Sequence, residues 1–286
     1  MKKIKLLLCL FMLTTLCGCS NSNKNESSKT LNAAMFWIST SLDPTNNYDG
    51  WVLSRIGVGE TLLKLNEKYE VEPYLAKSYE QIDDTTWKLT LKDSITFSNG
   101  KKVTGENVKS CLERAFEKNT RAIDYFDLNH VEAKGQDIYL YLNKSSGAIL
   151  NNLCEPLFTI YDASQSEEDI ASHPICTGPF VVDDFVSEKT IDTSKNKKYY
   201  DGKAKLDHVH FSQVADSDAR VLALQSGEVD LANTIDYSSL KLFRNNKDYQ
   251  VLEVLGPRTN VIYMNNETTF LSDLTIRKAL SYSVNR

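Results

Sequence analysis

Residues 87–116 read WKLTLKDSITFSNGKKVTGENVKSCLERAF, and this stretch decides the class of fold. Apolar and polar residues alternate strictly over 87–91, which is typical of a half-buried β-strand. The Asn99-Gly100 pair then indicates a tight turn, and Thr104 is placed to cap the first turn of a helix. Beyond Thr104 the apolar residues recur at helical spacing: Val108, Cys111, Leu112, Ala115 and Phe116. A strand, a turn and an amphipathic helix in succession predict an α/β or α+β architecture.

The rest of the body extends this pattern of strand pairs and single helices, which favours a mixed sheet. Strands are predicted at Leu31–Ile38, Val131–Ala133, Ile138–Leu142, Phe180–Val182, Glu188–Asp192, Val209–Val214, Val251–Leu255 and Asn260–Met264. Helices are predicted at Tyr48–Leu65, Asp216–Ser226 and Ser272–Val284. Gly135 is expected to bend a hairpin, and Gly227 to end the second of these helices. The glycines within Tyr48–Leu65 weaken the case for a continuous helix there.

The first thirty residues have the composition of an export signal followed by a polar linker. A basic start, an apolar run over residues 6–16 and the small residue Gly18 before Cys19 make a secretory signal. The apolar run is shorter than the roughly 20 residues that a membrane-spanning helix needs. Leu16-Cys17-Gly18-Cys19 resembles the lipobox of bacterial lipoproteins, which implies that Cys19 carries diacylglycerol. The alternative is an ordinary cleaved signal with incidental cysteines. Residues 19–30 have almost nothing to bury and are expected to be a disordered tether.

Composition and charge exclude some classes of function. The net charge is −5, and loss of a signal with three lysines makes it about −8, which does not suit nucleic acid. The hydrophobic share of 41% and the charged share of 25% are ordinary for a soluble globular protein. Three cysteines lie in the body, Cys111, Cys154 and Cys176. One disulfide and three separate thiols are both compatible with that number.

No motif of a catalytic site is present. The sequence has no nucleophile elbow, phosphate-binding loop, HExxH pair or dinucleotide-binding glycine motif. His208 and His210 lie two residues apart in a predicted strand and so face one side, a spacing that could hold a metal ion. The charged neighbours Lys205 and Asp207 fit a solvent-facing strand edge instead. We therefore predict no metal site, no cofactor and no enzymatic activity.

Three phrases of the sequence resemble one family, the extracellular solute-binding proteins, family 5, of peptide and nickel ABC importers. The first phrase contains Glu72-Pro73-x-Leu75-Ala76-x-Ser78, Trp87-x-Leu89-x-Leu91-Lys92-Asp93, Ile95-x-Phe97-Ser98-Asn99-Gly100 and Thr104-Gly105-Glu106-Asn107-Val108. The second contains Thr177-Gly178-Pro179-Phe180, residues 196–206 and Leu224-Gln225-Ser226-Gly227-Glu228-Val229-Asp230. The third is residues 276–286. The sequence departs from the family pattern at Tyr79, where Trp is usual, at Cys176, where Gly is usual, and at Ser98-Asn99, where His-Asp is usual.

The resemblance implies an α/β fold of the periplasmic-binding-protein-like type, class II. It divides the chain into a signal peptide (1–18), a tether (19–30), the first part of lobe I (31–70), an inserted α+β subdomain of lobe I (71–172), the second part of lobe I (173–259) and the start of lobe II (260–286). Family members continue past the third phrase into a second lobe. The chain is therefore expected to be a fragment or a natural truncation in which most of lobe II is missing.

The resemblance also implies a function. Such proteins close two lobes over a solute outside the cell and deliver it to the permease of an ABC importer. We expect a monomer anchored by lipid to the outer face of the cytoplasmic membrane. A peptide is the first expected solute because it is the broader class in the family, and a nickel or other metal chelate is the second. A non-functional fragment or a structural lipoprotein is a further alternative.

Ligand-binding residues are expected in two places. Phe36, Trp37 and Thr40 follow the first strand, where ligands of the family often touch; Trp51 and Arg55 either face the ligand or pack their own helix, and packing is favoured.

Arg121 and Tyr125 lie where nickel-chelate binders of the family offer an arginine and an aromatic ring. Glu155 stands where those relatives carry a second arginine before the proline that matches Pro156, which reverses the charge and weakens a nickel-chelate assignment.

Overall fold

The computed structural model describes residues 28–254, 256 and 259–284. The chain divides into two compact units, one that ends at Ser239 and one that begins at Leu240. The predicted signal peptide, the lipobox with Cys19 and most of the predicted tether lie outside the described residues. Among the residues that are described, no helix has the length and apolar character needed to cross a membrane.

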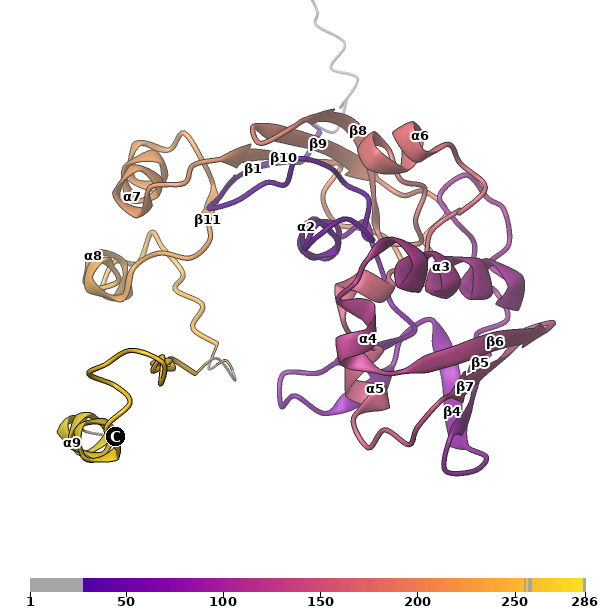
Figure 1. Ribbon diagram of the computed structural model, residues 1–286. Coiled ribbons are helices and arrows are strands. Elements are labelled where there is room, and N and C mark those ends of the chain that lie inside the picture. The colour runs from indigo at the N-terminus through magenta and orange to yellow at the C-terminus, as the bar shows by residue number, and fades with distance from the viewer. Residues whose placement is uncertain (1–27, 255, 257–258, 285–286) are drawn as a thin grey trace, which may run out of the picture. The chain divides into compact units, whose positions relative to one another are not determined.

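The first sheet of the larger unit is mixed. Its strands are β1 (Thr30–Met35), β8 (Phe180–Val186), β9 (Thr190–Lys195), β10 (His208–Gln213) and β11 (Leu231–Ala232), in the order β11-β1-β10-β9-β8. β1 runs parallel to both of its neighbours, while β8, β9 and β10 are antiparallel. Helix α2 (Gly50–Arg55) lies beneath this sheet in Figure 1. The predicted mixed α/β class is confirmed.

The second sheet contains the stretch from which the sequence analysis began. Its strands are β4 (Ala76–Gln81), β5 (Thr86–Leu91), β6 (Leu128–Lys134) and β7 (Asp137–Leu142), all antiparallel in the order β4-β5-β7-β6. Helix α3 (Gly105–Lys118) covers one face of it (Figure 1). A small third sheet joins β2 (Leu63–Leu65) to β3 (Val71–Pro73).

The local predictions around this sheet are confirmed. Gly100 adopts a φ of +90° in the turn, a conformation that glycine enters without steric cost. The Thr104 hydroxyl accepts a hydrogen bond from the Asn107 N–H at 3.4 Å, while the Thr104 N–H donates to the Asn107 side chain at 3.0 Å. This reciprocal capping box fixes the start of α3.

One continuous apolar core joins the two sheets of the larger unit. It includes the fully buried Leu89 of β5, Val108 of α3 and Ile191 of β9. Between the sheets, Phe158 packs within 5.9 Å of Phe116 and 5.1 Å of Phe126, measured between ring centroids. The two sheets therefore form one packed body, on which surface groups from distant parts of the chain can be held together.

The remaining helices are shorter than α3. They are α4 (Ala122–Tyr125), α5 (Ile149–Asn152), η1 (Pro156–Phe158), α6 (Glu167–Ser172), α7 (Ser217–Ser226), η2 (Tyr237–Ser239), α8 (Lys241–Arg244) and α9 (Leu274–Ser283). α7 ends at Gly227, whose φ is +75°, and α9 begins after Asp273, whose side chain accepts a hydrogen bond from the Thr275 N–H. Cys111, Cys154 and Cys176 are all free thiols, and burial raises the pKa of Cys111 to about 12.

Three predicted elements of secondary structure are wrong. Residues 48–65 do not form one helix, because α2 ends at Arg55, Gly57 takes a φ of +71° and residues 63–65 form β2. Residues 251–254 and 260–264 form no strand in the described part of the chain. Leu252 is 78% exposed and Ile262 is 76% exposed, so these apolar residues lack the neighbouring strand and the packing surface that a β-strand requires.

Candidate functional site

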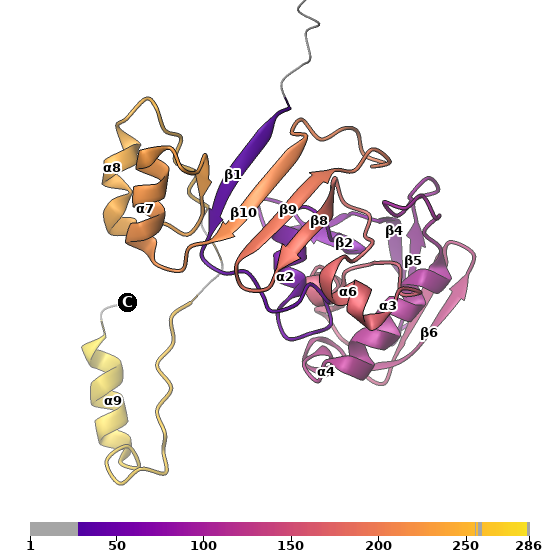
Figure 2. The same cartoon turned by 90° about the horizontal axis from the view of Figure 1, so that it is seen from above.

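The carboxyl ends of the parallel strands define one edge of the five-stranded sheet, where ligands bind in open α/β sheets. The chain leaves β1 at this edge through Phe36. The Phe36 N–H donates to the side-chain oxygen of Asn233, just after β11, at 3.0 Å. Two residues on, the Ile38 N–H donates to the side chain of Gln213 at the end of β10 at 2.6 Å. Side chains at the ends of β11 and β10 thus fix the backbone at Phe36 and Ile38. Figure 2 shows β10 beside β1.

Helix α2 brings a second aromatic ring and a guanidinium to Phe36. The Arg55 guanidinium carbon lies 5.4 Å from the centroid of the Phe36 ring and 5.5 Å from that of Trp51. Trp51 and Arg55 occupy positions i and i+4, which place them on the same helix face. The backbone of η1 positions this helix closely, since a side chain at Gly50 would meet the Pro156 carbonyl oxygen at 2.3 Å.

Arg121, the N-cap residue of α4, adds a second guanidinium. Its guanidinium carbon lies 3.7 Å from the centroid of the Tyr48 ring, a cation–π contact. Its Nη2 atom donates to the Tyr125 hydroxyl at 2.6 Å, and its Nη1 atom donates to the Asn47 carbonyl at 2.8 Å. The side chain is therefore held in one position by groups from the loop before α2 and from α4.

Glu155 links the two halves of this arrangement. Its Oε1 atom accepts a hydrogen bond from the Trp51 indole at 2.8 Å and lies 3.9 Å from Arg121 Nη2. The Glu155 side chain is only 14% exposed. Burial, reinforced by the charge of Glu155, raises the pKa of Tyr125 to about 12, so the Tyr125 hydroxyl stays protonated at neutral pH. We call the seven residues the aromatic–arginine cluster: Phe36, Tyr48, Trp51, Arg55, Arg121, Tyr125 and Glu155.

The aromatic–arginine cluster has the chemistry of a binding surface for a small solute. Tyr48 is 54% exposed and Trp51 is 38% exposed, so part of each ring is open to solvent. Two arginines and one glutamate give the cluster one net positive charge. Aromatic faces bind flat or cationic groups, and guanidinium binds carboxylates in a bidentate manner.

The structure brings together four of the residues predicted from the sequence: Phe36, Trp51, Arg121 and Tyr125. Trp37 is instead partly buried and packs on the apolar core. Thr40 lies at the turn between β8 and β9, where its carbonyl accepts a hydrogen bond from the Ser187 hydroxyl at 3.1 Å. These two residues therefore do not belong to the group that the structure brings together.

Sequence reasoning missed one member of the cluster, Tyr48. The only signal for it was an aromatic residue two positions before the start of α2, and an aromatic residue there also fits a packing role. Arg55 and Glu155 were noticed from the sequence, but their contacts with Trp51 come from tertiary packing.

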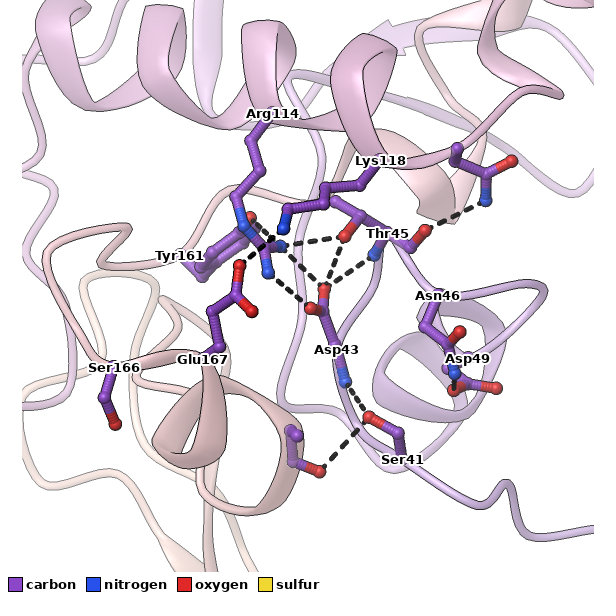
Figure 3. A network of polar contacts seen from close by, with 12 residues as sticks. Ser41, Asp43, Thr45, Asn46, Asp49, Arg114, Lys118, Tyr161, Ser166 and Glu167 are labelled. Carbon is purple, nitrogen blue, oxygen red and sulfur yellow. Dashed lines mark hydrogen bonds and ion pairs between the residues drawn. The ribbon is translucent and has the colours of Figure 1, made fainter.

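A second polar group, here called the Asp43 network, lies between α3 and the loop before α2 (Figure 3). Arg114 Nη2 is 2.6 Å from Asp43 Oδ2 and Arg114 Nη1 is 2.9 Å from Asp43 Oδ1, a bidentate pair. The same Nη1 atom also bonds to the Thr45 and Tyr161 hydroxyls at 2.8 and 2.9 Å. Lys118 and Glu167 pair at 2.6 Å beside it.

The Asp43 network has the features of a structural element. Burial disfavours the charge on Asp43, but hydrogen bonds from Arg114 and Thr45 outweigh this effect and lower its pKa. A surface hollow at the network is lined by these paired groups and by Glu168. Because each charge has an internal partner, the network offers little to a solute.

Asp49 lies next to the network with a different environment. It is only 2% exposed, and its carboxylate accepts a hydrogen bond from the Asn46 side chain at 2.6 Å. Burial, with a smaller effect from the charge of Asp43, raises the pKa of Asp49 to about 6. Within the described ranges, no set of three or more histidine, cysteine, aspartate or glutamate side chains is arranged to hold a metal ion.

Comparison with known proteins identifies relatives of the chain. Residues 70–286 match the family described as bacterial extracellular solute-binding proteins, family 5 Middle. The nickel-binding protein NikA of Staphylococcus aureus is 32% identical over 271 residues, which is 95% of this chain and 54% of NikA. The glutathione-binding protein GsiB of Escherichia coli is 27% identical, over 79% of this chain and 46% of GsiB.

A solved structure gives the same result. The crystal structure of Staphylococcus aureus NikA in complex with Ni(L-His)2 superposes with a TM-score of 0.72 at 33% identity, over 77% of this chain and 46% of that one. The chain spans about half the length of the curated relatives that it matches.

Proposed function

The chain belongs to family 5 of the bacterial extracellular solute-binding proteins, and from this premise we propose that it serves an ABC importer as its solute receptor. It binds a small solute outside the cell and delivers it to a membrane permease. A lipid on Cys19 keeps it at the outer face of the cytoplasmic membrane. The predicted family and the predicted periplasmic-binding-protein-like fold are both confirmed by the comparisons.

The observation that carries this proposal is the aromatic–arginine cluster at the carboxyl edge of the parallel strands. Rings and guanidinium groups from three separate segments converge there with the Glu155 carboxylate from a fourth, and the rings of Tyr48 and Trp51 are partly exposed. We place the solute on Tyr48 and Trp51, whose rings are partly exposed. The cluster forms one wall of the binding site.

We further propose that the solute is a nickel ion chelated by a small amino acid such as histidine. The relatives support this choice, because nickel is named for both the most extensive sequence match above and the superposed structure. The cluster is also chemically suited to it: aromatic faces accept imidazole rings, and guanidinium accepts the carboxylates of the chelating amino acid. This order reverses the expectation from the sequence, which placed peptides first.

A peptide is the second candidate. The glutathione-binding relative supports it, and so does Glu155, whose carboxylate could accept the ammonium group of a peptide. Tetrahedral ammonium and planar guanidinium compete for the same carboxylate, so Arg121 would move away from Glu155 when such a solute binds.

Isothermal titration of the purified chain tests the proposal. The titrants are Ni²⁺ with L-histidine, Ni²⁺ alone, L-histidine alone, glutathione and a set of dipeptides. We expect saturable binding of the nickel–histidine complex that is lost in Trp51→Ala and retained in Tyr139→Ala, whose ring lies on β7. Binding of glutathione or dipeptides with the same dependence on Trp51 would favour the second candidate. Binding of nickel–histidine unaffected by Trp51→Ala would overturn the assignment of the site.

A further inference from the structure

Two histidines project from the side of the five-stranded sheet that faces away from the core. In β10, Val209 and Phe211 are buried, whereas the His208 and His210 side chains are 52% and 40% exposed. Side chains at i and i+2 of a strand lie on the same face. The two imidazole rings therefore stand side by side on a surface that α2, which lies against the other face, does not cover (Figure 1).

Each ring has a carboxylate beside its Nδ1 atom. His210 Nδ1 is 2.6 Å from Asp192 Oδ1, on the adjacent strand β9. His208 Nδ1 is 4.0 Å from Asp183 Oδ2, on β8. Asp183 is itself held by the Ser194 hydroxyl, which donates to its other oxygen at 2.7 Å. Three neighbouring strands thus contribute to one ordered set of side chains.

Carboxylates in this position have a known chemical consequence. A carboxylate at Nδ1 favours the tautomer that carries its proton there, which leaves the lone pair on Nε2. Metal-binding histidines are commonly oriented in this way by a second carboxylate, which also makes the ring a stronger ligand. The hydrogen bond to Asp192 thus prepares His210 Nε2 to bind an ion, and His208 lies beside it on the same face of the strand with Asp183 4.0 Å from its Nδ1 atom.

We propose that His208 and His210 together bind one late first-row divalent cation, Ni²⁺, Cu²⁺ or Zn²⁺, through their Nε2 atoms. Imidazole nitrogen suits these ions and not Mg²⁺ or Ca²⁺, which prefer oxygen. The protein supplies two ligands, and water or a small chelating solute completes the coordination. Asp192 and Asp183 act as positioning residues.

This site is separate from the aromatic–arginine cluster. β1 and β10 are parallel, and His208 lies opposite Thr30 at the amino end of β1, whereas Phe36 follows its carboxyl end. The proposal does not depend on the proposed function, because a surface pair of histidines can bind an ion whether or not the cluster binds a solute.

The sequence alone predicted no metal here, and the reason is clear from the register. The spacing of the histidines was visible, but the carboxylates come from residues 16 to 27 positions away, and only strand pairing places them at the rings. The competing interpretation is that protonated histidines simply form ion pairs with Asp183 and Asp192.

Titration of the purified chain with Ni²⁺ alone at pH 7.5 tests the proposal, using His208→Ala, His210→Ala and the matched control His130→Ala, a lone histidine on β6. We expect one Ni²⁺ to bind the wild-type chain through this pair. Binding should be at least tenfold weaker in His208→Ala and in His210→Ala, and unchanged in His130→Ala and in Trp51→Ala.

Asp192→Asn should weaken Ni²⁺ binding about tenfold, because Asp192 orients the ligand His210. The electron paramagnetic resonance spectrum of bound Cu²⁺ should show two coupled nitrogens, reduced to one in each single variant.

The outcomes separate the interpretations. Equal binding in all variants, or equal losses in His130→Ala and His208→Ala, would overturn the proposal in favour of scattered single-histidine contacts. Retention of Ni²⁺ binding in His208→Ala with loss in Trp51→Ala would place the ion in the cluster instead. Circular dichroism of each variant establishes that the fold is intact, which is expected because both histidines are exposed.

Discussion

Arg114 and Arg121 lie seven residues apart, and both reach the loop that precedes α2, but they do so in opposite ways. The Arg114 side chain is only 15% exposed and forms a bidentate pair with Asp43. Arg121 is 26% exposed and lies flat against Tyr48, a ring that is itself more than half exposed. The charge of Arg114 is thus paired inside the protein, whereas Arg121 belongs to the aromatic–arginine cluster, which carries a net positive charge.

The difference teaches how the same side chain serves stability in one place and recognition in the other. A buried charge cannot lose its partner without a large desolvation cost. A partly exposed guanidinium stacked on a ring can exchange a hydrogen bond for one from a solute at small cost, because water stands in for the missing partner. Substitutions in the Asp43 network should therefore change stability, and substitutions in the aromatic–arginine cluster should change binding.

The largest expected effect comes from breaking the buried pair. Arg114→Met should destabilise the protein by about 3–5 kcal/mol, because it leaves the Asp43 carboxylate buried without a cation. Urea unfolding followed by circular dichroism measures the loss. Lys118→Met is the matched control: its pair with Glu167 is exposed, and its removal should cost less than about 1 kcal/mol.

A double variant sharpens this test. If the cost arises from an unpaired charge, then Asp43→Asn combined with Arg114→Met should be more stable than Arg114→Met alone. A double variant that is less stable than either single variant would mean that the Thr45 and Tyr161 contacts matter more than the charge.

The second largest effect should appear in binding and not in stability. Trp51→Ala removes a ring that is 38% exposed, so we expect a change of less than about 1 kcal/mol in unfolding free energy. Loss of an aromatic contact surface should weaken solute binding by about 2 kcal/mol or more, which isothermal titration measures. A loss of stability without a change in affinity would place Trp51 in the packing role that the sequence favoured.

The contrast also explains what could be predicted from the sequence. Thr104, Gly100 and Gly227 were predicted correctly because caps and turns depend on neighbouring residues alone. The helix predicted over residues 48–65 is wrong. The apolar residues of this stretch fit the helical period along its whole length, so the pattern does not show that the helix ends before Gly57. The pairing of residues 63–65 with 71–73 then decided the outcome.

For the site, the family resemblance pointed to Phe36, Trp51, Arg121 and Tyr125 as separate positions. Tyr48 contacts Arg121, and Glu155 contacts Trp51, which lies 104 residues away in the sequence. These contacts between distant segments arise from tertiary packing and could not be predicted from the sequence. The same applies to Asp43 and Arg114, which neither the motifs nor the periodicity connected.

A smaller effect distinguishes two aspartates of the same loop by pH. Asp43 has a lowered pKa, whereas that of Asp49 is raised from 3.8 to about 6. A raised pKa in the folded state favours the protonated form, so the stability that Asp49 contributes is full below pH 4 and is lost as the pH rises through 6.

Asp49→Asn should therefore match the wild type near pH 4 and melt a few degrees higher at pH 7.5. Thermal unfolding of both proteins across this range measures the difference. An asparagine variant that is less stable than the wild type at pH 7.5 would contradict the prediction and show that the hydrogen bond from Asn46 stabilises the charged carboxylate more than burial destabilises it.

The smallest effect concerns the charge that the aromatic–arginine cluster presents to a solute. Glu155→Gln keeps an oxygen that can accept the Trp51 indole N–H, so the ring should stay in place, while the net charge of the cluster rises from one to two. Anionic solutes should then bind a few-fold tighter and cationic peptides a few-fold weaker, because a single partly screened charge contributes about 0.5–1 kcal/mol. The difference in affinity should shrink between 50 mM and 500 mM salt, since screening acts on the charge and not on the hydrogen bond.

Glu167→Gln, which removes the same charge beside Lys118, is the control and should leave the affinities for both classes of solute unchanged. If Glu155→Gln instead weakens the binding of anionic and cationic solutes equally at all salt concentrations, then Glu155 acts by orienting Trp51 and Arg121. In that case the negative charge at this position, where nickel-chelate binders of the family carry an arginine, does not set the preference for the solute.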